Sequence, residues 1–86
     1  MSTEKQKIEK TVKEFSALMN NRLQSKRRKG FSGWTDPIMR RDLETRLLNK
    51  MAKVIRSVAT QEDYVDIANI AMMLDGIHEQ FFIPFE

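Results

Sequence analysis

The sequence predicts an all-α protein: a three-helix unit that assembles into a helical-bundle homo-oligomer. Apolar residues recur every three or four positions along two segments, which is the spacing of one helix face. Two of the three glycines and the first of two prolines gather in residues 29–37, which predicts one long loop after the first helix. A chain of 86 residues is long enough for a single domain, 1–86, with one hydrophobic core.

The first helix is expected over about residues 4–28. Ser2 or Thr3 supplies an oxygen that can cap its first turn. The glycines of residues 29–37 end it, because a backbone that must turn there cannot continue as a helix. Its apolar stripe is Ile8, Val12, Phe15, Leu18, Met19 and Leu23.

The second helix is expected over about residues 37–58. Asp36 is a good N-cap, and Pro37 is tolerated at the first helical position. Its apolar stripe is Met39, Leu43, Leu47, Met51, Val54 or Ile55, and Val58.

The third helix is expected over about residues 61–80, with Thr60 and Asp63 forming an approximate capping box. Apolar residues cover most of its circumference between 64 and 77, so a single buried face cannot account for them. We therefore expect a central helix that contacts its own chain and a partner copy, in a dimer first and a tetramer second. The apolar tail 81–86 is expected to pack against a neighbouring helix or subunit.

The composition excludes several classes of site and location. There is no cysteine, which removes disulfides, thiolate nucleophiles and sulfur-bound zinc, and a single histidine, His78, cannot build a histidine-rich metal site. No apolar run approaches the length of a membrane span, and residues 1–10 contain no apolar signal core. We expect a cytoplasmic protein with no membrane partner.

Charge is divided unevenly along the chain. All fifteen basic residues precede Thr60, and the net charge is +6 over residues 1–29, +3 over 30–58 and −6 over 59–86. Such a chain attracts an anion to its first two thirds or neutralises itself when its parts or two copies pack together. The densest run, residues 26–29, suits either a nucleic-acid contact or a solvated helix end.

Two segments resemble one family. Residues 29–34 (Lys-Gly-Phe-Ser-Gly-Trp), followed by Asp36-Pro37 and by residues 43–47, resemble the KG..GW turn and following helix of the MazG-like nucleotide pyrophosphohydrolases, particularly the short phage-type members. Residues 63–74 resemble that family's ExxD-V-A-N-x-x-M-M helix. Together the similarity covers about residues 15–75.

The resemblance implies an all-α oligomer and a nucleotide site. Family members hydrolyse nucleoside triphosphates to monophosphate and pyrophosphate, with magnesium held by an EExxE motif on one helix and an ExxD motif on the next. Asp63 and Asp66 match the second motif, whereas the EExxE positions read Asn49, Lys50 and Lys53. A protonated lysine cannot bind magnesium, but it can bind a phosphate directly, so the departure argues against catalysis and leaves nucleotide binding open.

The candidate ligand-binding residues come from the loop and from the second and third predicted helices. Arg46, Lys50 and Lys53 share one helical face, which suits a phosphate site, a solvated surface, or a set of ion pairs to Asp63 and Asp66. These interpretations can hold together, because a lysine paired with an aspartate still has N–H groups to donate to a phosphate. Trp34 suits base stacking or a core position, and Asn69 suits a base edge or a bond to a neighbouring helix. The full candidate set is Lys29, Trp34, Arg46, Asn49, Lys50, Lys53 and Asn69.

Three functions remain open at this point. The leading hypothesis is a non-catalytic binder of a nucleotide or nucleotide-derived signal, with no cofactor, used by a phage in the host-cell cytoplasm as a sponge for an immune nucleotide. The second is a divergent magnesium-dependent pyrophosphohydrolase using Asp63, Asp66 and Glu44 or Glu62. The third is a phage protein-interaction or inhibitor module, or a nucleic-acid binder that uses its basic first helix.

Overall fold

The computed structural model describes residues 3–31, 33–34 and 36–81, with only the backbone described for 79–81. Its elements are α1 (Glu4–Arg28), a 3₁₀ turn η1 (Pro37–Met39), α2 (Arg40–Ile55) and α3 (Gln61–Phe81). The described part of the chain contains helices and no strand. The predicted all-α class is therefore confirmed. Of the expected tail 81–86, the backbone of Phe81 belongs to α3, and residues 82–86 lie outside the described residues.

The helix starts follow from side-chain caps. Thr3 and Gln6 form a capping box at the start of α1, and Thr60 and Asp63 form the equivalent reciprocal bonds at the start of α3. The Asp36 carboxylate accepts a hydrogen bond from the Ile38 amide at the start of η1, with Pro37 in the first turn. The predicted starts of α1 and α3 are thus confirmed.

The second helix is shorter than predicted at both ends. Residues 37–39 form η1 rather than α-helix, and α2 ends at Ile55 instead of 58. Ser57 takes a positive φ of 59°, while the Ser57 amide donates to Val54 and the Val58 amide donates to Lys53. This is a Schellman motif, which ends the helix and leaves Val58 outside it.

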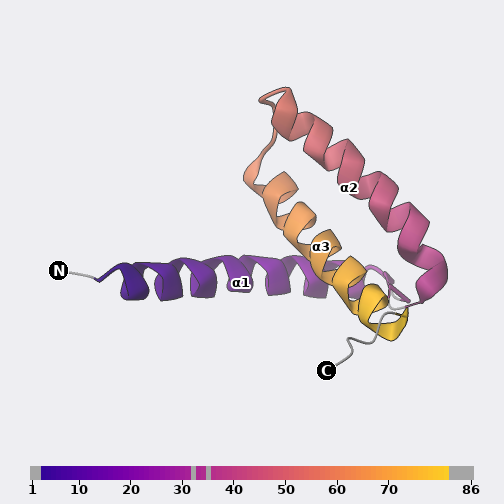
Figure 1. Ribbon diagram of the computed structural model, residues 1–86, viewed down its shortest axis with the longest axis horizontal. Coiled ribbons are helices and arrows are strands. Elements are labelled where there is room, and N and C mark those ends of the chain that lie inside the picture. Colours follow the sequence, from indigo (N-terminus) through magenta and orange to yellow (C-terminus); the bar gives the residue numbers. More distant parts are fainter. Residues whose placement is uncertain (1–2, 32, 35, 82–86) are drawn as a thin grey trace.

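α3 is the central helix of the chain. It packs against both α1 and α2, and Figure 1 shows α2 and α3 running side by side in opposite directions while α1 crosses α3. The core cluster lies between α2 and α3, and it consists of Leu43, Ile70, Met73 and Ile77. Leu23, Phe31 and Trp34 pack against its edge.

Only one half of α1 lies against the rest of the molecule. Its C-terminal half contacts α3, whereas its N-terminal half extends away from the other helices (Figure 1). No residue of α1 is buried, and the stripe residues Ile8 and Val12 are 56% and 59% exposed. Other parts of the chain therefore cover the apolar stripe predicted for this helix at its C-terminal end only.

Candidate anion-binding site

A cluster of ion pairs joins the three helices at the N-terminal half of α3. Its centre is two carboxylates, Asp63 and Asp66, which are 4% and 3% exposed. They lie three residues apart, so they share one face of the helix. Buried carboxylates need hydrogen bonds and opposite charges, and α1 and α2 supply both.

Lys50 of α2 connects the two carboxylates. Its Nζ lies 2.8 Å from Asp63 Oδ1 and 3.2 Å from Asp66 Oδ2. Lys53, one turn further along α2, contacts Asp63 alone at 3.5 Å. Of the three interpretations that the sequence left open for this face, the structure shows the ion pairs to Asp63 and Asp66 for Lys50 and Lys53. Arg46 instead pairs with Asp42 within α2.

Two residues of α1 complete the surroundings of Asp66. Arg22 Nε donates to Asp66 Oδ1 at 3.1 Å, and Lys26 Nζ lies 3.6 Å from the same oxygen. Arg22 also reaches Glu62 through Nη2 at 2.6 Å. Asp66 therefore has three cations around it, from two different helices.

These contacts determine the charge states. The Lys50 hydrogen bond, helped by the Thr60 amide, holds the pKa of Asp63 well below its usual range. Burial raises the pKa of Asp66, but hydrogen bonds from Arg22 and Lys50 lower it by more. The Lys50 pKa is raised, chiefly by its bond to Asp63, so carboxylates and ammonium are all charged at neutral pH.

A cavity of about 320 Å³ opens beside this cluster. The volume is at the lower end of small-molecule sites. Four basic side chains, one carboxylate, two amides and an apolar wall line it: Arg22, Lys26, Arg46, Lys50, Asp66, Asn49, Asn69, Phe31, Leu43, Ile70 and Met73. The lining has a net charge of +3 and includes one aromatic ring, a combination that suits an organic anion.

The structure brings four of the predicted ligand residues together. Arg46, Asn49, Lys50 and Asn69 line the same cavity. Lys53 pairs with Asp63 but is not part of the lining.

The two loop candidates lie elsewhere. Lys29 is the exposed C-cap of α1. Trp34 packs against the hydrophobic core, 3.6 Å from the place that a Cβ at Gly76 would occupy. It lines a neighbouring cavity of about 330 Å³, which shares only Phe31 with the first.

Sequence reasoning missed Arg22, Lys26 and Phe31. Arg22 and Lys26 lie four residues apart, on the same face of α1 as Met19. Residues at this spacing face the same neighbouring element, and this signal could have identified them. Phe31 follows Gly30, whose φ of 94° turns the chain at the end of α1 and whose neighbours form a Schellman motif. That turn brings the Phe31 ring to 5.9 Å from Lys26 Nζ.

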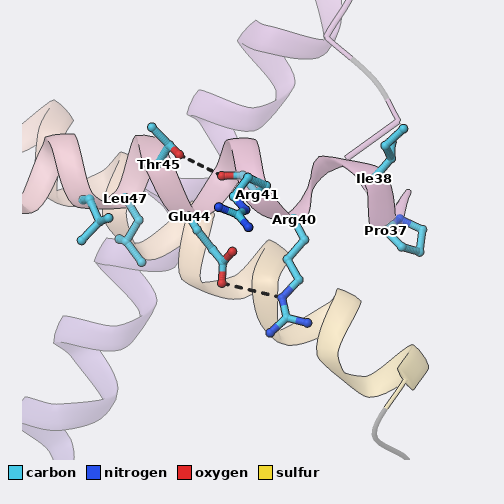
Figure 2. A pocket seen from close by; sticks show the side chains of 8 residues that line it. Pro37, Ile38, Arg40, Arg41, Glu44, Thr45 and Leu47 are labelled. Carbon is cyan, nitrogen blue, oxygen red and sulfur yellow. Dashed lines mark hydrogen bonds and ion pairs between the residues drawn. The ribbon is translucent and has the colours of Figure 1, made fainter.

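The side chains do not fit a magnesium ion. Mg²⁺ requires oxygen ligands in octahedral geometry, whereas an ammonium group bridges the two carboxylates here. Among the residues that the structure describes, no three His, Cys, Asp or Glu side chains gather at metal-binding distances. Glu62 pairs with Arg22, and Glu44 lies on a different surface of α2, where Figure 2 shows it facing Arg40.

That second surface is a broad depression formed by η1 and α2 (Figure 2). The pair Arg40–Glu44 spans one helical turn at 3.7 Å, and the Thr45 hydroxyl donates to the Arg41 carbonyl. These are contacts within one helix. The depression therefore lacks the convergence of side chains from several helices that characterises the cavity beside Asp66.

Comparisons with known proteins add no relative. No match is found for the chain among protein-family models, curated proteins or solved structures. Within the described residues, no helix has the length and apolar content that crossing a bilayer requires.

Proposed function

We propose that this protein is a non-catalytic binder of a nucleotide or a nucleotide-derived small molecule. The observation that supports this most directly is the cavity in which Arg22, Lys26, Arg46 and Lys50 surround an apolar wall. Cationic side chains bind phosphate through charge-assisted hydrogen bonds, and the apolar wall with Phe31 offers a place for a base.

The cations differ in how readily they can turn to a ligand. Arg46 pairs with Asp42 one turn away, at 2.9 Å, and both side chains are half exposed. Exposed pairs of this kind contribute only about 0.3–0.5 kcal/mol. Of the four cations, Arg46 therefore gives up the least interaction free energy when it turns to bind a phosphate. Lys50 can donate to the phosphate while it keeps its contacts with the two carboxylates.

The donor set favours binding over hydrolysis. In the MazG-like magnesium enzymes that the sequence resembles, carboxylates hold the ion that neutralises the phosphates; in this chain the corresponding positions carry Asn49, Lys50 and Lys53. A protein of this kind acts by mass action, because each bound molecule is removed from solution. The resemblance to phage-type members favours use as a sponge for an immune nucleotide in the cytoplasm of the host cell.

The protein is further proposed to act as a homo-oligomer, a dimer first and a tetramer second. The exposed stripe at Ile8 and Val12 and the exposed Tyr64 and Met72 of α3 support this, since a second copy would bury them.

Ligand capture tests the proposed function. Purified protein is incubated with nucleoside triphosphates, deoxynucleotides and cyclic nucleotides plus magnesium, separated from free ligand, denatured by heat, and the released species are identified by mass spectrometry. We expect an intact nucleotide in the protein fraction. Monophosphate and pyrophosphate accumulating in the free fraction would instead establish a hydrolase, and an empty protein fraction with no consumption would point to a macromolecular partner.

A matched pair of variants ties the result to the cavity. Lys50→Met and Lys53→Met each remove one ammonium group that contacts Asp63, but only Lys50 lines the cavity. We expect at least about a tenfold loss of captured nucleotide for Lys50→Met and a much smaller change for Lys53→Met. Circular dichroism verifies that both variants fold, and equal losses in the two variants would contradict the assignment.

A further inference from the structure

The amide of Asn69 has a buried oxygen without a hydrogen-bond donor in the described part of the chain. Asn69 lies in the middle of α3, is 3% exposed, and lines the cavity beside Asp66. Its Nδ2 donates to the Met19 carbonyl of α1 at 3.2 Å. Its Oδ1 has no donor among the residues that the structure describes.

The contact with α1 determines which atom of the Asn69 amide remains without a hydrogen-bond partner. A backbone carbonyl can only accept, so Asn69 must present its NH₂ group to Met19. The oxygen is then an acceptor held in one orientation by the helix packing. A buried acceptor without a donor is unfavourable, and a ligand that brings an N–H group to it removes that cost.

The surroundings of the amide suit a flat aromatic ring. Ile70 and Met73 lie one and four residues after Asn69 on α3 and line the same cavity, together with Phe31. Three of the cavity's cations, from α1 and α2, contact Asp66, and the fourth, Arg46, pairs with Asp42. A base against the apolar wall and a phosphate at the cations would together occupy the lining.

We propose that Asn69 reads the base of the bound ligand and that the ligand is a nucleotide whose base carries an exocyclic amino group. This inference rests on the proposed function. An amino group projects beyond the ring edge and donates to a recessed oxygen. A uracil edge places two carbonyl oxygens beside its single N–H, and these would face the Asn69 oxygen with like partial charge.

Two pairs of probes test this in the unaltered protein by isothermal titration calorimetry. Adenosine 5′-monophosphate and purine riboside 5′-monophosphate differ only in the amino group. Cytidine and uridine 5′-monophosphates differ in an amino group against a carbonyl. We expect the amino member of each pair to bind about tenfold more tightly or better, as for a buried acceptor that loses its donor.

Two variants separate base reading from phosphate binding. Asn69→Ala removes the acceptor, so the ratio of the two affinities within each probe pair is expected to fall towards one. Arg46→Met removes a phosphate contact, so affinity for both members is expected to fall by a similar factor while the ratio is kept. The ligand pairs remain decisive even where Asn69→Ala fails to fold, because they need no substitution.

The outcomes distinguish the two proposals. Ratios near one, or a preference for uridine over cytidine, overturn base reading by Asn69 and leave the anion site standing. Binding of none of the four probes overturns base reading by Asn69. The proposed nucleotide site is overturned as well if the capture assay then returns no nucleotide of any kind, whereas a captured triphosphate or cyclic nucleotide leaves that site standing.

Discussion

A single ammonium group, that of Lys50, links two helices and two carboxylates. It occupies the position between Asp63 and Asp66 that a cation shared by both would take. Breaking such a buried pair by removing one partner is costly, because the remaining charge loses its counter-ion. The lysine therefore has two roles, one in holding α2 to α3 and one in presenting positive charge to the cavity.

Asp66 competes with any anion for the same cations. We expect Asp66→Asn to bind inorganic pyrophosphate about threefold more tightly or better, because Arg22, Lys26 and Lys50 lose a negative neighbour. Equilibrium dialysis with labelled pyrophosphate, without magnesium, measures this. Weaker binding in the variant would contradict the role of Asp66 as an internal counter-ion, and Asp42→Asn, which frees Arg46 alone, is the matched comparison.

Stability should depend on pH in the acid range. The folded pKa values of Asp63 and Asp66 are lowered from the usual 3.8, so the unfolded chain binds protons more readily than the folded one. Their stabilisation is complete above the unfolded pKa and is lost as the pH falls below about 4 towards the folded values. Thermal unfolding between pH 6 and 2.5 measures it, and Asp63→Asn should lower the melting temperature at pH 6 while flattening this acid slope.

At the scale of elements, two Schellman motifs end α1 and α2. Gly30 takes the left-handed position after α1, where φ is 94°, and a Cβ there would meet no neighbouring atom within 4 Å. Ser57 takes the equivalent position after α2 with φ of 59°. The first motif places Phe31 at the cavity, and the second brings the chain back into α3, so both turns position the site.

These turns predict opposite effects for two substitutions. Ser57→Gly should stabilise the protein by up to about 1 kcal/mol, because glycine adopts a positive φ without steric cost. Gly30→Ala should destabilise it by about 1 kcal/mol for the same reason. Urea unfolding followed by circular dichroism measures both, and equal signs for the two variants would contradict the assignment.

Local sequence signals account for most of the fold but for only part of the site. Thr3, Thr60 and Gly30 carry recognisable cap and turn chemistry, so α1 was predicted at its observed bounds and the start of α3 at its observed residue. Ser57 carries no such signature, so the end of α2 was predicted three residues late. The contact between Arg22 and Asp66 joins positions 44 residues apart, and no local pattern encodes it.

At the scale of the whole molecule, the chain is extended for its length. Its radius of gyration is 15.1 Å, whereas a compact chain of 86 residues has about 12 Å. Five apolar side chains are buried in the described part: Leu43, Val65, Ile70, Met73 and Ile77. So small a core offsets the conformational entropy of folding only narrowly, and burial between copies would add to it.

Sedimentation velocity at micromolar concentration measures the association. We expect a dimer or larger species, and we expect Val12→Glu to shift it towards monomer because a charge would enter the exposed stripe of α1. Lys13→Glu, a neighbouring charge change on the same helix, serves as the control. A monomer for the unaltered chain would contradict the homo-oligomer.

The extended half of α1 also has a consequence for backbone dynamics. Isolated helices shorter than about 12–15 residues are marginal in water, and the turns in the N-terminal half of α1 extend away from the other described helices. Their amide protons should exchange with solvent orders of magnitude faster than those of α3, which packs on two sides. If a second copy covers this segment, its amide exchange slows as the protein concentration rises. The exchange rate of these amides then reports the fraction of chains that have associated.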